Sequence, residues 1–157
     1  MKKFELTNEF IANRFGTKLF RIRALVEFGD VEAGELGGYV ENESNLGHDD
    51  NAWVYDNAWV YGDAQVSGDA LVCGNGDYAY AHGFGSVNRT TTFFRLKDGG
   101  VGVRCGCFYG TLAQFRDKIR ETHGETKKAQ EYLMLADLME LRFEEDENEV
   151  GNRKYVE

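Results

Sequence analysis

The chain of 157 residues contains no proline and only three cysteines. Without proline, it has no stiff, proline-rich linker between domains. An odd number of cysteines without an export signal predicts reduced thiols in a cytoplasm rather than a disulfide framework. The chain also lacks an apolar run long enough to span a membrane and the apolar core of a signal peptide. These absences predict a cytoplasmic protein that does not associate with membranes.

Basic residues are scarce relative to acidic ones. The chain has 27 aspartates and glutamates against 18 lysines and arginines, which gives a formal net charge of −9. Binding to the phosphate backbone of a nucleic acid depends on lysine and arginine, so this balance argues against direct nucleic-acid binding. It permits binding to a basic protein surface, although acidic residues also simply keep a protein in solution.

The middle of the chain contains a six-residue repeat. An alanine recurs every six residues, and a valine follows each alanine two positions later. The pairs are Ala52 and Val54, Ala58 and Val60, Ala64 and Val66, and Ala70 and Val72. Because side chains alternate along a strand, both members of a pair point the same way, into a core, and the residue between them points outward. Turn formers such as Asp56-Asn57 and Gly62-Asp63 separate the pairs. The period predicts a parallel β-helix with three short strands in each coil.

The repeat resembles that of the left-handed β-helix, or hexapeptide-repeat, proteins. In that family an aliphatic residue is followed four positions later by a small one, as Val54 is followed by Ala58. The resemblance implies a mainly β fold with a short left-handed parallel β-helix at its centre. The expected parts are an N-terminal strand cap over 1–37, the β-helix over 38–82, a β-hairpin with a two-helix subdomain over 83–143, and a mobile acidic tail over 144–157. Enzymes and inert scaffolds share this fold, so it does not define a function.

The sequence after the repeat predicts a hairpin and two helices. Two strand-like segments flank the turn formers Asp98-Gly99-Gly100. Thr111 and Gln114 have the spacing of a capping box, which predicts a helix that ends at Gly124. A second helix is expected from Thr126 to about Phe143. Its apolar residues cover more than one stripe, which favours burial on two sides, one of them against a second subunit. Together with the open ends of a short coil, this helix predicts a homo-oligomer, either a dimer or a trimer.

Segments along nearly the whole chain resemble those of small bacteriophage and prophage proteins. The matching segments are FRIRAL, FGDVEAGELGGYVE, NAWVYDNA, TTTFFRLKDG, CGCFYGTLAQF and ETHG. This family is described as hexapeptide-repeat or β-helix proteins of unknown role. The resemblance implies a phage or prophage accessory protein in the cytoplasm of a bacterial host. It implies no reaction, cofactor or catalytic residue.

Two histidines are the candidates for catalysis. Acyltransferases with left-handed β-helices use a histidine near the coils as general base and hold an acyl-coenzyme A between neighbouring prisms. His48 and His82 lie at the two ends of the repeat and are candidates for that role, and a surface or turn position is the alternative for each. The projecting loop of such enzymes is not evident. We therefore expect a protein without enzymatic activity, with a hexapeptide-repeat acyltransferase or its remnant as the alternative.

Cysteine and histidine residues in the C-terminal part are candidate metal ligands. Cys105 and Cys107 are separated by one residue, whereas structural zinc sites use two to four intervening residues. His123, and at most Cys73, remain to complete a ligand set. On a strand, the two cysteines would point the same way, most simply into a core. We therefore expect neither a metal nor a cofactor.

Outward-facing aromatic residues and the last helix are the candidate interfaces. Trp53, Tyr55, Trp59 and Tyr61 lie at outward or corner positions of the repeat, and aromatic residues are enriched in binding hot spots. The alternative is that other segments of the chain cover them. On the last helix the candidates are Leu135, Leu138 and Met139.

Three functions follow from these observations. The first is a non-enzymatic accessory protein that binds a host or phage protein, for instance to inhibit a basic host defence or regulatory protein. The second is acyl transfer, and the third is a structural role in a virion or its assembly.

Overall fold

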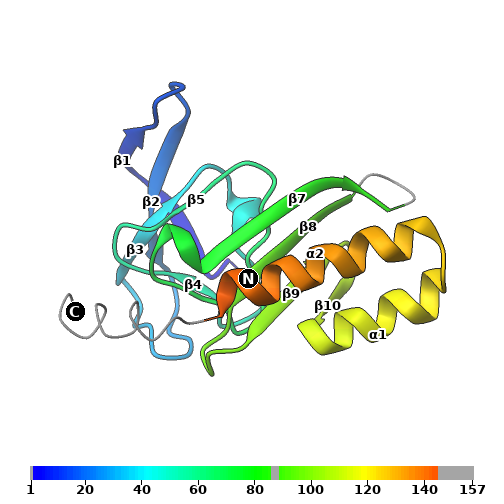
Figure 1. The fold of residues 1–157 in the computed structure, drawn as a ribbon. Coiled ribbons are helices and arrows are strands. Elements are labelled where there is room, and N and C mark those ends of the chain that lie inside the picture. The colour runs from blue at the N-terminus through cyan, green and yellow to red at the C-terminus, as the bar shows by residue number, and fades with distance from the viewer. Residues whose placement is uncertain (1, 86–88, 145–157) are drawn as a thin grey trace.

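Two four-stranded sheets and one two-stranded sheet form the framework of the protein. The computed structural model describes residues 2–85 and 89–144. The first sheet has the order β1-β2-β3-β5. Its strands are β1 (Phe4–Ala12), β2 (Lys18–Ala24), β3 (Leu36–Val40) and β5 (Trp59–Val60). The small parallel sheet pairs β4 (Trp53–Val54) with β6 (Leu71–Val72). The β1–β2 hairpin projects from the body of the molecule (Figure 1).

The second four-stranded sheet is antiparallel throughout and has the order β10-β9-β8-β7. Its strands are β7 (Tyr78–Phe84), β8 (Arg89–Arg95), β9 (Val101–Cys105) and β10 (Phe108–Thr111). The hairpin predicted around Asp98-Gly99-Gly100 is confirmed as β8 and β9. The side chains of adjacent residues Phe93 and Phe94 alternate across the sheet and belong to different hydrophobic cores. This sheet therefore separates the two cores.

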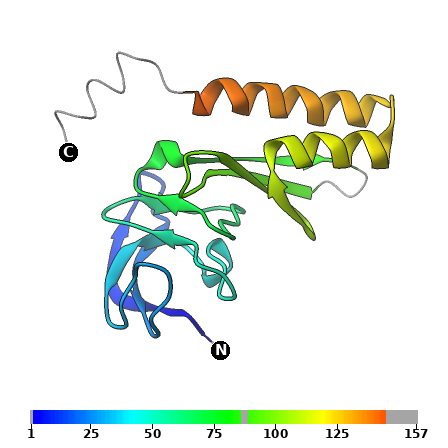
Figure 2. The same cartoon turned by 90° about the horizontal axis from the view of Figure 1, so that it is seen from below.

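Both helices begin and end where the sequence predicts. Helix α1 (Leu112–His123) starts with the expected capping box, in which the Gln114 backbone N–H donates to Thr111 Oγ1 and the Thr111 backbone N–H donates to Gln114 Oε1. It ends at Gly124, whose φ is +60°. Helix α2 (Lys127–Phe143) follows the N-cap residue Thr126. Figure 2 shows the helices side by side on one face of the β7–β10 sheet, with the N-terminal strands beyond it.

The prediction of a left-handed parallel β-helix is wrong. The long ladders are antiparallel: β1 with β2, β2 with β3, and every pair of the second sheet. Parallel pairing in the part of the chain that the structure describes is confined to β3 with β5, β4 with β6, and one bridge between Leu46 and Val66. A β-helix needs parallel ladders that continue from coil to coil, whereas these two-residue strands stop after a single pairing. Residues 2–85 and 89–144 therefore contain no solenoid sheet.

The repeat nevertheless has the local geometry that its sequence predicts. All eight alanines and valines of the repeat are buried in the first core. The corner residues Asp56, Gly62 and Gly68 have φ values of 54°, 66° and 69°, and they stand six residues apart. Left-handed backbone at this interval explains why glycine or aspartate occupies the corner. The repeat thus encodes turns and inward side chains, but not the stacking of coils.

The predicted four-part division of the chain stays a prediction. The boundaries at 37 and 82 fall inside β3 and β7. The predicted acidic tail lies outside the described residues, apart from Glu144. No helix within the described residues combines the length and the apolar character needed to cross a bilayer.

Candidate functional site

His48 is a packing residue in this structure. Its Nδ1 accepts a hydrogen bond from the backbone N–H of Lys3, with the two nitrogens 3.1 Å apart. Its ring stacks on Phe4, with the ring centroids 4.3 Å apart and the planes 6° from parallel. The nitrogen that accepts from the backbone is not available to take a proton from a substrate. The geometry therefore gives His48 a role in fixing the first strand.

His82 is exposed on β7, but its neighbours do not orient it as a general base. Its Nδ1 lies 2.7 Å from Thr90 Oγ1 and 4.0 Å from Asp63 Oδ2. An orienting carboxylate in an acid–base site binds the ring nitrogen opposite to the one that faces the substrate hydroxyl. Here the Asp63 carboxylate, at 4.0 Å, is beyond hydrogen-bond distance of the ring, and the Thr90 hydroxyl is the group within reach of Nδ1. This arrangement does not support the role predicted for His82.

Cys105, Cys107 and His123 line one cavity of about 330 Å³ beside Tyr132. Cys105 Sγ accepts a hydrogen bond from Thr91 Oγ1 at 3.3 Å. Burial, together with Cys105, raises the pKa of Tyr132 to about 12. The two cysteines do not share one strand, because β9 ends at Cys105 and a turn at Gly106 leaves Cys107 exposed. Within the described residues, no three histidine, cysteine or carboxylate side chains are placed to hold a metal ion.

The aromatic residues of the repeat differ in burial. Trp53 is fully buried, so of its two alternatives the structure supports cover by other segments of the chain. Its ring packs edge-on against Phe28, with the centroids 5.2 Å apart, and also against Phe4. Segments before the repeat therefore cover it. Trp59 is half-buried and Tyr61 is exposed, while Tyr55 packs against the first core and also lines a surface cleft.

The predicted interface residues of α2 are spread around the helix. Met139 is buried in the second core, Leu135 is half-buried, and Leu138 is exposed. Sequence reasoning missed Met134 and Leu141, which are also exposed. Their spacing from Leu138, four residues before and three after, is the sequence signal that would have placed all three on one face.

The sequence reasoning also missed an aromatic residue on the projecting hairpin. Phe15 lies between β1 and β2 and is 88% exposed. Phe10, on β1, is half exposed, and Lys18 Nζ lies over its ring at 4.8 Å from the centroid. Phe15 lies in the turn that follows β1, and no pattern in the sequence distinguishes it from a core phenylalanine.

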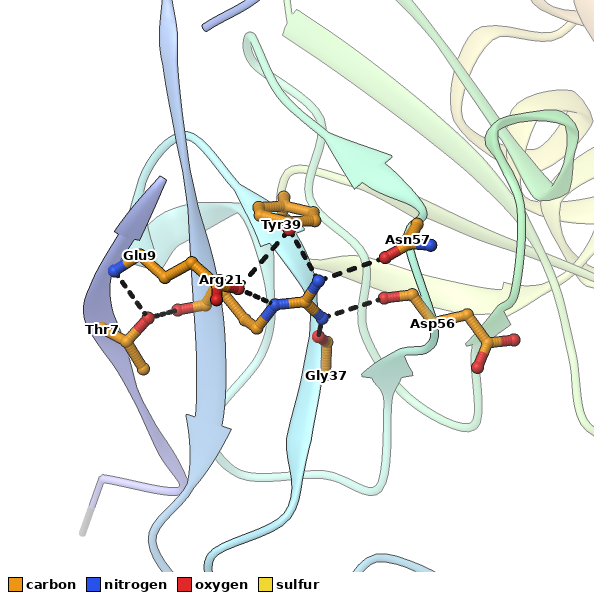
Figure 3. Close-up of polar contacts among 7 residues, drawn as sticks. All are labelled: Thr7, Glu9, Arg21, Gly37, Tyr39, Asp56 and Asn57. Carbon is orange, nitrogen blue, oxygen red and sulfur yellow. Dashed lines mark hydrogen bonds and ion pairs between the residues drawn. The ribbon is translucent and has the colours of Figure 1, made fainter. Parts of the chain in front are cut away.

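The densest group of polar contacts surrounds Arg21 (Figure 3). All five guanidinium N–H groups have an acceptor. The acceptors are Glu9 Oε2, the carbonyl oxygens of Gly37 and Asp56, the Tyr39 hydroxyl and Asn57 Oδ1. The guanidinium also lies over the Tyr39 ring at 4.3 Å from its centroid. Since no donor is left for a ligand, this group holds the first sheet to the Asp56 corner and is structural.

A cleft beside Tyr55 is the best candidate binding site. It has a volume of about 360 Å³, near the small end of the range for ligand sites. Tyr55 lines it together with three aspartates, Asp30, Asp69 and Asp98, and a single lysine, Lys97. These residues come from the loop after β2, the corners of the repeat and the β8–β9 turn. The cleft thus lies between the loop after β2, the small β4–β6 sheet and the β8–β9 turn.

The electrostatics of the cleft favour a cation. Lys97 Nζ donates to Asp30 Oδ2 at 2.9 Å, and this contact raises the pKa of Lys97. Burial raises the pKa of Tyr55, and the negative charges of Asp30 and Glu35 raise it further. Because Lys97 is paired with Asp30, the carboxylates of Asp69 and Asp98 give the cleft a net negative charge. Such a site can accept a lysine or arginine side chain against the face or hydroxyl of a tyrosine.

A larger cavity, of about 570 Å³, lies between the β8–β9 turn and the end of α2. Glu144, the last described residue, lines it together with Phe143 and Glu140. Because it adjoins the boundary of the described residues, we do not assign a site to it.

The fold and the cleft define a mainly β protein with a helical hairpin on one sheet and an acidic cleft between the loop after β2 and the β8–β9 turn. No protein-family model matches the chain, and neither the curated proteins nor the solved structures contain a match.

Proposed function

We propose that this chain is a protein-binding protein without a reaction of its own, which holds a basic segment of a partner in the Tyr55 cleft. The observation that supports it is the composition of the cleft, in which three aspartates and a tyrosine surround a lysine that is already paired. A partner lysine or arginine would gain carboxylate acceptors and an aromatic face there.

The partner segment would extend beyond the cleft. A cavity of about 360 Å³ accommodates one long side chain, and an exposed ion pair contributes only about 0–1 kcal/mol. The loop between β2 and β3 adds Glu27, Glu32 and Glu35 close in sequence to Asp30, all of them exposed and without a lysine or arginine among them. Several basic residues of one segment would therefore bind together along this loop.

The phage or prophage proteins that the sequence resembles supply the proposed setting. In it, the partner is a basic host protein, such as a nucleic-acid-binding defence or regulatory factor, and binding covers its basic surface. This proposal agrees with the scarcity of basic residues in the chain.

Capture from bacterial lysate with three matched baits tests the proposal. The baits are the wild type, Asp69→Lys in the cleft and Asp117→Lys on α1. Both variants change the net charge equally, and both aspartates are exposed. We expect basic proteins on the wild type and on Asp117→Lys, and at least a tenfold loss on Asp69→Lys. Equal capture by all three baits, or no enriched protein on the wild type, would overturn the proposal.

A further inference from the structure

We infer that the cavity beside Cys107 binds a small organic anion, one that carries a carboxylate on an apolar body. This Cys107 cavity lies where the end of α1, the start of β8 and the β9–β10 turn meet. It shares no residue with the Tyr55 cleft, so the inference does not depend on the proposed function.

The floor of the Cys107 cavity is apolar. Phe115, Ile119 and Tyr132 belong to the second core and line the cavity, and the half-buried Phe108 packs against them. The volume of about 330 Å³ is near the small end of the range for ligand sites. An apolar ring or branched chain that enters the cavity would therefore leave water and contact these side chains.

The rim of the cavity is basic. Arg89, at the start of β8, lines it together with Lys118 and His123 of α1. Among the described residues that line it, none is an aspartate or a glutamate, and residues 86–88 have no acidic residue in their sequence. This local excess of positive charge runs against the overall composition of 27 acidic and 18 basic residues. It predicts that the polar end of a ligand is negatively charged.

The Arg89 guanidinium is available to a ligand. The Arg89 side chain makes no hydrogen bond or ion pair with any residue that the structure describes. It lies against Gly106, where a Cβ atom would collide with it. Burial, together with Cys105, raises the pKa of Tyr132 to about 12, so the Tyr132 hydroxyl stays neutral at pH 7 and adds no negative charge to the cavity. A carboxylate can therefore accept two N–H groups from one edge of the guanidinium.

Neighbouring carboxylates do not neutralise the rim. Glu121 lies 3.9 Å from Lys118 Nζ, but both side chains are more than half exposed, and Glu121 does not line the cavity. Asp63 lines a second, polar cavity together with Arg89. Within the described residues, its ionic contact is with His82 at 4.0 Å and not with Arg89. Exposed charges at such distances interact weakly, so the cavity keeps its positive potential.

Two thiol reagents of different charge test this potential. Cys107 is exposed and lines the cavity, whereas Cys73 is exposed elsewhere, where its backbone N–H donates to the carboxylate of Asp77. With iodoacetate and with iodoacetamide, the thiolate sulfur displaces iodide, so the ratio of the two rates cancels any difference in thiolate fraction. We expect the iodoacetate-to-iodoacetamide ratio, measured by peptide mass spectrometry, to be at least about threefold higher at Cys107 than at Cys73.

A matched pair of variants assigns the potential to the rim. Arg89→Gln should lower the ratio at Cys107, because it removes one positive charge from the cavity. Arg120→Gln is the control, since Arg120 is also an exposed arginine and lies on α1 but does not line the cavity. It should leave the ratio near the wild-type value. Equal ratios at the two cysteines of the wild type, or equal effects of the two variants, would contradict the inference.

A titration with two probes tests binding itself. The probes are phenylacetate and phenylethanol, which has the same ring and no charge. In the ¹⁵N-labelled full chain, we expect phenylacetate to shift the amides of Cys107, Ile119 and His123 and to bind at least about tenfold more tightly than the alcohol. Arg89→Gln and, independently, Lys118→Gln should weaken the binding of phenylacetate alone. No shifts at these amides, or equal affinities for the two probes, would overturn the inference.

Discussion

Among single residues, Arg21 makes the most polar contacts between segments distant in sequence. Its guanidinium joins Glu9 on β1, the backbone of β3 and the left-handed corner at Asp56 (Figure 3). A lysine has three donors on one nitrogen and cannot reproduce this planar, five-donor arrangement.

We expect Arg21→Lys to lower the free energy of unfolding by about 2 kcal/mol, since several acceptors lose their donor. Arg23→Lys is the matched control on the same strand. Among the described residues Arg23 donates only to Glu5, and its side chain is 48% exposed, so the loss for Arg23→Lys should stay below about 0.5 kcal/mol. Urea denaturation of both variants measures the difference. Equal losses would show that the Arg21 contacts do not stabilise the fold.

At the scale of elements, short parallel pairings hold the strands of the repeat, and side-chain acceptors hold its corners. The backbone N–H groups of Gly62, Gly68 and Gly74 donate to the carboxylates of Glu41, Asp50 and Asp77, respectively. Acidic residues therefore satisfy corner N–H groups that no neighbouring coil reaches.

Of these three carboxylates, Asp50 is the one that binds a buried lysine. Besides Gly68, it accepts from the Ala52 N–H and from the ammonium of Lys3, which is buried. Burial lowers the pKa of Lys3, and the charge and hydrogen bond of Asp50 act in the opposite direction. Removing Asp50 would take the hydrogen-bonded carboxylate from a buried cation and leave the exposed Asp49 as a weaker negative charge nearby.

Asp50→Ala is expected to lower the free energy of unfolding by about 3 kcal/mol. The neighbouring Asp49 is exposed, and Asp49→Ala should change it by less than about 0.5 kcal/mol. Chemical denaturation monitored by the fluorescence of the two tryptophans, Trp53 and Trp59, gives both values. If Asp49→Ala were as damaging as Asp50→Ala, net charge and not these hydrogen bonds would explain the loss.

The sequence predicted the features that depend on neighbouring residues and missed those that join distant segments. Local signals were sufficient for the α1 capping box, the β8–β9 hairpin and the inward side chains of the repeat, because each depends on neighbours within a few residues. The prediction of a β-helix was wrong, because that fold requires coils to stack through residues far apart in sequence. The burial of Trp53 by Phe28 and the meeting of Asp30 with Lys97 in the cleft also join distant segments that no local pattern connects.

At the scale of the whole molecule, the cleft and the two helices lie on different parts of the protein. The cleft lies between the N-terminal loops and the β8–β9 turn. Helices α1 and α2 lie on one face of the β7–β10 sheet (Figure 2), and neither lines the cleft.

The central claim is that the Tyr55 cleft binds basic segments of proteins, and an NMR titration of the ¹⁵N-labelled chain with a hexalysine peptide tests it most directly. We predict that the largest amide shifts occur at Tyr55, Asp69 and Lys97, that Asp69→Lys abolishes them, and that Asp117→Lys retains them. Shifts centred on the Phe15 hairpin, or no shifts at the cleft, would contradict the account.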